Sequence, residues 1–372
     1  MIIRNVCIWC NSKSLTDYFK DNYSTPIASY MQENLTEFEI IPYNVQKCEE
    51  CKSYQIKYLA EVYKVYKYNH AYSYGSTLKE MCNVFSKFIL SNSGIKSILE
   101  IGAGNGFLAD IITRNNKDIS YTIVDPSYFG NKDNKIIINS IIEEYNTEKC
   151  DNDTVILSHV FEHFYEPVKI INILKAIKNL KNVMLNMPNL ELYLKNNTFH
   201  VLNTEHTYFI ENSFLEDIFR IHGYKLHNKL FFKEHSVFFH FIRMDELTTI
   251  DKPINVNSTE LVSSYFNKIY NLENIISLKK NNNPVYLWPC SMHSQFLLNF
   301  WKDPEVVTGL LDNSPDKIGK YLYGFKIPCI SFKYILDLNV PSIVILNGGC
   351  FNVELETILS SPKYNNIEFI IV

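Results

Sequence analysis

Short apolar runs alternate with amphipathic segments through most of this chain. Short runs bounded by turn residues are typical of buried strands, and apolar residues at helical spacing are typical of helices that pack on a sheet. The alternation predicts an α/β fold with a doubly wound, mainly parallel sheet. In the central region we expect strands at 97–101, 120–124, 135–138, 154–157 and 182–187, and helices at 77–91, 107–113, 168–180 and 213–222.

A second α/β unit is expected near the C-terminus, after a boundary at 250–253. An amphipathic helix at 259–279 should connect it to the central region. A chain of 372 residues is also longer than one typical domain. We therefore predict three domains, at 1–60, 61–250 and 251–372, with C-terminal strands at 284–288, 306–311, 341–346 and 368–372 and a helix at 291–301.

A glycine-rich turn, LEIGAGNG at 99–106, follows the first central strand and leads into a helix. Glycines allow a sharp turn and a close approach to a ligand, and the helix N-terminus offers free N–H groups. Asp125 ends the next strand, where such sheets present a carboxylate to ribose hydroxyls. Glu100 and the lack of a further spaced glycine favour S-adenosylmethionine over a dinucleotide, and an ordinary turn is the alternative. The candidate cofactor-binding residues are Glu100, Gly102, Ala103, Gly104, Asn105, Gly106 and Asp125.

Charge and composition narrow the class of partner. The formal net charge of −4 provides no surface that attracts polyanions, so we do not expect nucleic acid as the main partner. The sequence contains neither a long apolar run nor a signal peptide, which predicts a soluble, cytoplasmic protein without a membrane partner. In that compartment cysteines are expected as thiols or metal ligands rather than as disulfides.

Two CxxC pairs lie near the N-terminus, Cys7–Cys10 and Cys48–Cys51. Each pair can place two thiolates on one tight turn, and two such turns form a tetrahedral four-sulfur site that suits zinc. Because all four ligands come from protein, this zinc would be structural. The residues between the pairs must then form a small subdomain, with a strand at 38–41. A redox role or coincidence is the alternative.

The segment 63–76 is dense in tyrosine and includes Tyr72 and Tyr74. It is either a packed linker or a lid that contributes phenol groups to a pocket. Both interpretations stay open, because tyrosine is common throughout this chain.

Three segments are expected to meet at one edge of the central sheet, because ligands bind beyond the carboxyl ends of parallel strands. They are the glycine turn, the segment 158–163 and the segment 186–189. The second of these contains Ser158, His159 and His163. The predicted crevice is therefore rich in groups that can act as acids or bases.

The segment 158–167, SHVFEHFYEP, resembles the region after the fourth strand of class I S-adenosylmethionine-dependent methyltransferases. Together with LEIGAGNG and Asp125, this resemblance covers about residues 97–189. It implies that Glu100 and residues 102–106 surround the methionine part of the cofactor and that Asp125 binds its ribose. Ser158 and His159 would also lie at the cofactor, with His159 near the sulfonium or the adenine.

The order of the segments along the whole chain is similar to that of the deoxysugar C-methyltransferases, which act on nucleotide-linked 4-keto sugars. In that family a Tyr-x-Glu-His loop supplies the base, and here the loop reads Asn203-Thr204-Glu205-His206. The resemblance implies that His206 is the base, supported by Glu205. Tyr72 and Tyr74 match the tyrosine-rich segment of the family approximately. His159, His163 and His200 are rival candidates for the base.

The sequence differs from the usual pattern of that family at three places. The glycine turn lacks an aspartate that the family usually carries, and Asn203 replaces a tyrosine. The first turn of the C-terminal unit, at 288–294, has no glycine, although Ser291 and a helix N-terminus could receive a phosphate. The C-terminal unit is therefore expected either to bind the nucleotide-linked sugar or to serve packing alone. The alternatives for the whole chain are an O- or N-methyltransferase of another small molecule and a non-catalytic cofactor-binding scaffold.

Overall fold

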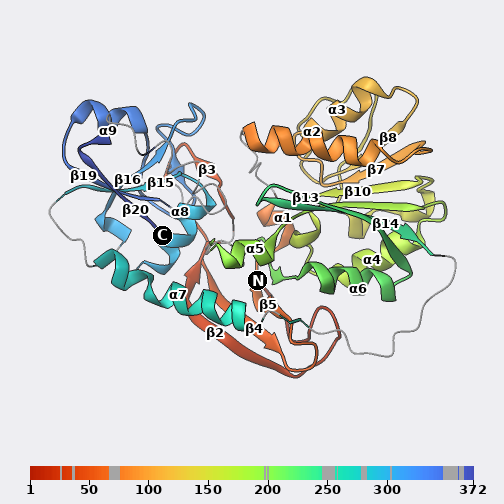
Figure 1. The fold of residues 1–372 in the computed structure, drawn as a ribbon, viewed down its shortest axis with the longest axis horizontal. Coiled ribbons are helices and arrows are strands. Elements are labelled where there is room, and N and C mark those ends of the chain that lie inside the picture. Colours follow the sequence, from red (N-terminus) through yellow and green to blue (C-terminus); the bar gives the residue numbers. More distant parts are fainter. Residues whose placement is uncertain are drawn as a thin grey trace.

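The central region forms one seven-stranded sheet in the computed structural model (Figure 1). The strand order is β13–β14–β11–β10–β7–β8–β9. The strands from β11 to β9 are parallel, and β14 runs antiparallel to both of its neighbours. This arrangement confirms the predicted doubly wound α/β sheet. The strands are β7 (Ser97–Ile101), β8 (Ser120–Val124), β9 (Ile136–Ile138), β10 (Thr154–Ser158), β11 (Asn182–Pro188), β13 (Tyr224–Phe232) and β14 (Ser236–Arg243).

Most of the chain is described by the structure. The described residues are 1–25, 27–35, 38–66, 76–196, 198, 201–244, 256–257, 259–277, 283–301, 304–346, 359 and 364–372. Tyr72, Tyr74, His200 and the predicted boundary at 250–253 lie outside them.

Helices cover both faces of the central sheet, with α2 and α3 on one face and α4 and α6 on the other (Figure 1). Alternate residues of a strand point to opposite faces. In β10, Ile156 accordingly packs in the core beneath α2 and α3, whereas Val155 and Leu157 pack in the core beneath α4 and α6. The helices are α2 (Ser76–Leu90), α3 (Phe107–Asn115), α4 (Pro167–Ala176), α5 (Leu190–Lys195) and α6 (Asn212–Ile221).

The N-terminal residues form a small subdomain that shares strands with both other regions. Its four-stranded sheet has the order β12–β5–β4–β2, and β12 comes from the chain beyond β11. Its strand β3 pairs antiparallel with β17 of the C-terminal region. The elements are β1 (Ile2–Ile3), β2 (Leu15–Ser24), β3 (Met31–Gln32), β4 (Ile41–Cys48), β5 (Tyr54–Ile56), β6 (Tyr58–Leu59), α1 (Val62–Val65) and β12 (Tyr208–Phe209).

The C-terminal region contains a second, five-stranded parallel sheet in the order β18–β16–β15–β19–β20. This is the additional Rossmann-like unit that the sequence predicts. The helix α7 connects it to the rest of the chain (Figure 1). The elements are α7 (Thr259–Ser277), β15 (Val285–Trp288), α8 (Met292–Phe300), β16 (Val307–Asp312), β17 (Tyr321–Leu322), β18 (Cys329–Ser331), α9 (Phe332–Leu338), β19 (Ser342–Leu346) and β20 (Ile367–Ile371).

Two predicted elements differ from the observed bounds by more than two residues. The strand expected at 38–41 begins only at Ile41, because Phe38 and Ile40 are 38% and 52% exposed and do not enter the core. The helix expected at 168–180 ends at Ala176. Ile177 and Leu180 beyond it are buried in a connecting segment, and this burial extends the apolar pattern past the helix.

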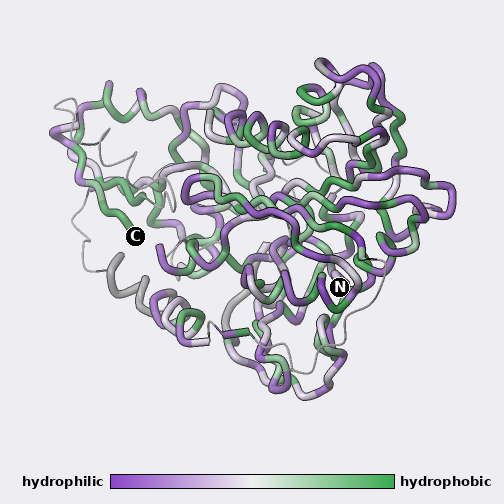
Figure 2. Tube along the Cα trace, turned by 45° about the vertical axis from the view of Figure 1, so that its right-hand side comes forward, coloured by the Kyte–Doolittle hydropathy of each residue, from purple (hydrophilic) through white to green (hydrophobic). Residues whose placement is uncertain are grey.

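Hydrophobic segments run through the interior of the molecule, and the outer loops are mostly hydrophilic (Figure 2). Among the described residues, no helix is both long enough and apolar enough to span a membrane.

Candidate functional site

Three neighbouring parallel strands end at the candidate site. Strand β10 pairs with β7 on one side and with β11 on the other, so the segments that follow them share one sheet edge. The backbone N–H of His159 donates to the carbonyl of Asn186 at 2.7 Å, and Asn186 Nδ2 donates to Ser158 Oγ at 3.0 Å. The glycine turn and the segments 158–163 and 186–189 therefore lie at the same edge, where sheets of this kind bind ligands.

The glycine turn has a conformation that side chains would disturb. Gly102, Gly104 and Gly106 have φ angles of 69°, 57° and 73°, in the left-handed region. A Cβ atom at Gly102 would lie 2.6 Å from Cγ2 of Val160, and one at Gly106 would overlap the Tyr128 side chain. At Gly104, by contrast, no heavy atom of the described chain other than those of the glycine and its two chain neighbours lies within 4 Å of the Cβ position. The turn therefore leaves open space beside Gly104 that a ligand could fill.

Asp125 ties this turn to the end of β8. Its Oδ2 accepts the backbone N–H of Gly104 at 2.8 Å, and its Oδ1 accepts that of Ser127 at 2.7 Å. Burial raises the pKa of Asp125 above its usual value, although both backbone hydrogen bonds lower it. Each carboxylate oxygen keeps a second lone pair, which can accept a ribose hydroxyl. The open space at Gly104 and this carboxylate together fit S-adenosylmethionine.

The other predicted cofactor residues of the turn serve the local structure. Glu100 is buried, and its Oε2 accepts a 2.8 Å hydrogen bond from the Tyr121 hydroxyl. Burial raises the pKa of Glu100 to about 7. Asn105 Oδ1 accepts the backbone N–H of Phe107 at the start of α3, and Ala103 is buried. A direct contact between these three residues and the cofactor stays a prediction.

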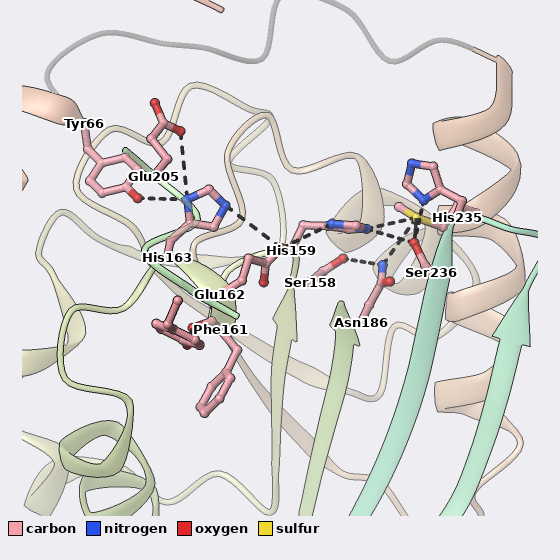
Figure 3. Close-up of polar contacts among 12 residues, drawn as sticks. Tyr66, Ser158, His159, Phe161, Glu162, His163, Asn186, Glu205, His235 and Ser236 are labelled. Carbon is pink, nitrogen blue, oxygen red and sulfur yellow. Dashed lines mark hydrogen bonds and ion pairs between the residues drawn. The ribbon is translucent and has the colours of Figure 1, made fainter. Parts of the chain in front are cut away.

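His159 lies between Ser236 on one side and Glu162 on the other (Figure 3). Its φ of 53° is unusual for a residue other than glycine and costs backbone energy. Both ring nitrogens of His159 have polar partners. Nε2 lies 3.2 Å from Ser236 Oγ, and Nδ1 lies 3.4 Å from Glu162 Oε1. Backbone strain of this kind is concentrated at functional sites.

A second group of polar side chains, the acid–base cluster, consists of Tyr66, Glu162, His163, Glu205 and His206. His163 is central: its Nδ1 lies 3.1 Å from the Tyr66 hydroxyl and 3.9 Å from Glu205 Oε2, and its Nε2 lies 4.0 Å from Glu162 Oε1 (Figure 3). One donor atom each of Glu162, His163 and His206 lies within 4.8 Å of the other two. Two carboxyl groups, two imidazoles and a phenol thus meet in one place.

His206 is buried within this cluster. Burial and the neighbouring His163 lower the pKa of His206 to about 4, against the opposing effect of Glu162 and Glu205. The imidazole is therefore neutral at pH 7. Its Nδ1 is buried and has no hydrogen-bond partner among the described residues. A neutral imidazole with an unpaired nitrogen can accept a proton.

Glu162 is the fully buried acid of the cluster. Neither of its oxygens has a hydrogen-bond partner within the described chain, and the ionisable side chains paired with it are those of His159 and His163. Burial raises the pKa of Glu162, but contact with His159 and the positive charge of the surrounding histidines outweigh burial, and the pKa falls below its usual value. Glu162 therefore favours the protonated form of whichever histidine takes up a proton.

Asn203 shapes the loop that carries Glu205 and His206. Its Oδ1 accepts the backbone N–H of Glu205 at 2.7 Å and that of His206 at 2.9 Å. An asparagine side chain commonly folds a loop in this way. The residue that departs from the sugar C-methyltransferase pattern thus organises the loop, and Tyr66 is the phenol that the described residues bring to the cluster.

The four cysteines of the CxxC pairs meet at one point, with all four Sγ atoms within 4.8 Å of one another. Cys7 Sγ lies 3.5 Å from Cys51 Sγ, and Cys10 Sγ lies 3.6 Å from Cys48 Sγ. All four are free thiols, because these distances far exceed the roughly 2 Å of a disulfide. Four thiolates in this spacing fit a tetrahedral zinc ion.

Sequence reasoning missed part of the acid–base cluster. It named Glu205 and His206 as the reactive pair and His163 as a rival, but it assigned no role to Glu162 or Tyr66. Both residues stand in the quoted motifs, Glu162 beside His163 and Tyr66 within the tyrosine-rich segment. The signal that could have found Glu162 is its place in the segment 158–163, which the sequence already predicts at the sheet edge.

A family model described as a methyltransferase domain matches residues 72–229, about two fifths of the chain. A search of curated proteins found no match. Among solved structures, the plantazolicin methyltransferase BpumL in complex with a substrate analogue and S-adenosylhomocysteine is 13% identical, with 45% of this chain and 84% of that chain covered and a TM-score of 0.37.

Two further solved structures are similar at the same level. An S-adenosylmethionine-dependent methyltransferase from Aquifex aeolicus is 12% identical, with 43% of this chain and 89% of that chain covered and a TM-score of 0.34. The magnesium protoporphyrin IX methyltransferase from Synechocystis PCC 6803 is 12% identical, with 45% and 84% covered and a TM-score of 0.35.

The family match and the geometry of the turn agree on one reaction class. The match covers the sheet edge with the glycine turn and Asp125, and those residues fit the methyl donor of that class. The central region is therefore a methyltransferase domain whose glycine turn and Asp125 fit S-adenosylmethionine as the methyl donor.

Proposed function

We propose that this methyltransferase transfers a methyl group to carbon in a nucleotide-linked keto (deoxy) sugar, after a histidine removes the proton next to the ketone. The observation that supports this most strongly is the acid–base cluster. A neutral, buried His206 lies beside His163, and the carboxylates of Glu162 and Glu205 lie 4.0 Å and 3.9 Å from the two ring nitrogens of His163. Methylation of carbon needs such a base, because the carbon must first become a nucleophile.

In this mechanism His206 takes the proton from the carbon next to the ketone. The C–H electron pair forms the C=C bond of the enolate, the carbonyl π pair moves onto the oxygen, and the imidazole becomes an imidazolium. Glu162 and Glu205 stabilise that positive charge, since both raise the pKa of His206. The Tyr66 hydroxyl, 3.1 Å from His163 Nδ1, can donate a hydrogen bond to the developing enolate oxygen.

S-adenosylmethionine, held by the glycine turn and Asp125, would supply an electrophilic methyl group. The enolate carbon would form the new C–C bond as the sulfur–methyl bond breaks and S-adenosylhomocysteine leaves, and the proton would stay on the imidazole until the product leaves. The chain positions both reactants, because the turn after β7 and the segment after β10 lie at one sheet edge. The zinc proposed at Cys7, Cys10, Cys48 and Cys51 stabilises the fold and takes no part in the reaction.

An O- or N-methyltransferase of a small molecule is the second candidate, and one observation in the C-terminal unit favours it. Lys317 Nζ already binds Asp312 Oδ2 and the carbonyl of Cys290, both at 2.8 Å. A cation with two partners is less available to a pyrophosphate. The turn at 288–294 also lacks the glycines that allow a close backbone approach.

Deuterium exchange separates the two candidates. The chain is incubated in D2O with a panel of nucleoside diphosphate-linked keto sugars and S-adenosylhomocysteine, so that no methyl group is transferred. Deuterium that enters a sugar carbon next to the ketone in the native chain, but not in the His206→Ala variant, supports the C-methyltransferase. Methyl transfer to oxygen or nitrogen without any such exchange contradicts it.

Calorimetric titration tests the nucleotide. S-adenosylhomocysteine is titrated first, and a panel of nucleoside diphosphates follows. Binding of both supports a nucleotide-linked substrate, and binding of the cofactor product alone favours the small-molecule candidate.

A further inference from the structure

Gln295 on α8 binds an N-terminal segment, residues 25 and 27–29, through both the nitrogen and the oxygen of its side-chain amide. Its Nε2 lies 2.9 Å from three oxygens, which are Thr25 Oγ1 and the carbonyls of Ile27 and Tyr323. Its Oε1 accepts the backbone N–H of Ser29 at 2.8 Å. Gln295 is only 3% exposed, so water does not compete for these contacts. A residue of the C-terminal unit thus fixes the backbone of the N-terminal segment.

The same segment holds the loop of the acid–base cluster. The backbone N–H of Ala28 donates to Glu205 Oε1 at 2.7 Å, and Thr204 Oγ1 donates to the carbonyl of Thr25 at 2.8 Å. Both Glu205 and Thr204 are buried. The carboxylate of Glu205 therefore takes its position from the backbone of residue 28.

Two further contacts hold this segment against the C-terminal unit. Gly324 has a φ of 94°, and a Cβ atom there would overlap Cγ2 of Thr25. Strand β3 follows the segment directly and pairs with β17, with Met31 opposite Leu322. The segment is thus fixed to the C-terminal unit on one side and to the reactive loop on the other.

We propose that Gln295 is a positioning residue: through residues 25 and 27–29 it sets the position of Glu205, so that the C-terminal unit controls the geometry of the acid–base cluster. The inference rests on the proposed function only in giving Glu205 a catalytic role. Its physical basis is independent, because Glu205 Oε2 lies 3.9 Å from His163 Nδ1 and a shift of about 1 Å in a reactive group can lower a rate about a hundredfold.

Hydrogen–deuterium exchange of the full-length chain tests the linkage without a substrate. In the Gln295→Ala variant, amides in 27–29 and in 205–206 should both exchange about tenfold faster or more, since buried hydrogen bonds are lost. Ser294→Ala is the matched control: it removes a buried hydrogen bond from the same helix, to the carbonyl of Pro289, without touching the segment. Faster exchange at 27–29 with unchanged exchange at 205–206 overturns the proposal.

Thr204→Val provides a second, milder variant in case Gln295→Ala does not fold. It removes only the side-chain hydrogen bond to the carbonyl of Thr25. Faster exchange on both sides of that bond supports the linkage, and exchange confined to residue 204 contradicts it.

Turnover tests the catalytic consequence, with a substrate identified by the deuterium screen. Gln295→Ala should lower kcat by roughly tenfold to a hundredfold and change the KM for S-adenosylmethionine less than about twofold. In a Glu205→Gln background the same substitution should have little further effect, because both act on one carboxylate. Fully additive losses overturn the proposal. If Glu205→Gln alone keeps full turnover, the proposed function fails, while the exchange result still decides the structural linkage.

Discussion

The rings of His163 and His206 meet edge to face, with their centroids 4.9 Å apart and their planes at 86°. His206 is the buried member of the pair, and His163 is half-buried beside Tyr66 and Glu205. The two imidazoles come from different segments, one after β10 and the other before β12. Their contact joins the methyltransferase sheet to the loop at 203–206, which the resemblance to sugar C-methyltransferases predicts to be reactive.

His206→Ala should lower turnover about a hundredfold or more, because it removes the proposed base. The affinity for S-adenosylhomocysteine should change less than about twofold, since the cluster lies outside the glycine turn. Steady-state kinetics and calorimetry measure the two effects. His222→Ala is the control, because His222 only caps the end of α6 by binding the carbonyl of Ile218. Unchanged turnover in His206→Ala would move the role of base to His163 or His159.

Asp125→Asn should weaken S-adenosylhomocysteine binding about tenfold or more. The carboxylate accepts two backbone N–H groups, and an asparagine would turn its own NH2 group toward one of them. It would also lose an acceptor for the ribose. Calorimetric titration measures the change against Asp133→Asn, a substitution at an exposed position outside the turn. Equal affinity in both variants would show that Asp125 does not hold the cofactor.

Glu100 should make the native state less stable as the pH rises. Its pKa is about 7 in the folded chain, against about 4.5 for an unperturbed glutamate. A raised pKa in the folded state adds stability below pH 4.5, and that stability is lost between pH 4.5 and 7. The loss amounts to at most about 3 kcal/mol.

Denaturant unfolding across pH 4.5 to 7 measures this effect. The Glu100→Gln variant should show a flatter dependence on pH than the native chain, because it has no proton to lose. Glu148→Gln, at an exposed position, should keep the native dependence. Parallel curves for Glu100→Gln and the native chain would contradict the prediction.

Cys48→Ser should abolish stoichiometric zinc and unfold the N-terminal subdomain. Structural zinc contributes on the order of 10 kcal/mol of folding free energy, and a serine hydroxyl does not replace a thiolate ligand. Elemental analysis and circular dichroism measure both effects. Cys82→Ser serves as the control, since Cys82 is a buried free thiol on α2 outside the cluster. If the native chain is purified without bound zinc, the prediction is wrong.

The central sheet could be predicted because local pattern and tertiary packing agree there. Ile98 and Ile156 are buried on one face and Leu99 and Val155 on the other, so these strands appear as short continuous apolar runs. The N-terminal sheet could not be predicted in the same way. Strand β2 contains many polar residues, and the edge strand β12 pairs with β5 only through a long-range contact, with Phe209 opposite Tyr54.

The candidate site was predictable where it depends on motif spacing. The glycine turn, Asp125 and the four cysteines lie as their spacing predicts, because each is fixed by one strand end or one turn. The acid–base cluster depends instead on the packing of the loop at 203–206 against the segment at 161–163. Sequence spacing carries no information about that contact, and Glu162 and Tyr66 went unassigned for this reason.

The pairing of β3 with β17 has a consequence for synthesis on the ribosome. Met31 and Gln32 emerge near the beginning of translation, whereas Leu322 and Tyr321 emerge near its end. The short strand β3 therefore has no partner until almost the whole chain has been made. Strand β12 likewise reaches β5 only after the central sheet is largely complete. We expect the N-terminal subdomain to reach its final structure late in folding, although its residues are the first to be synthesised.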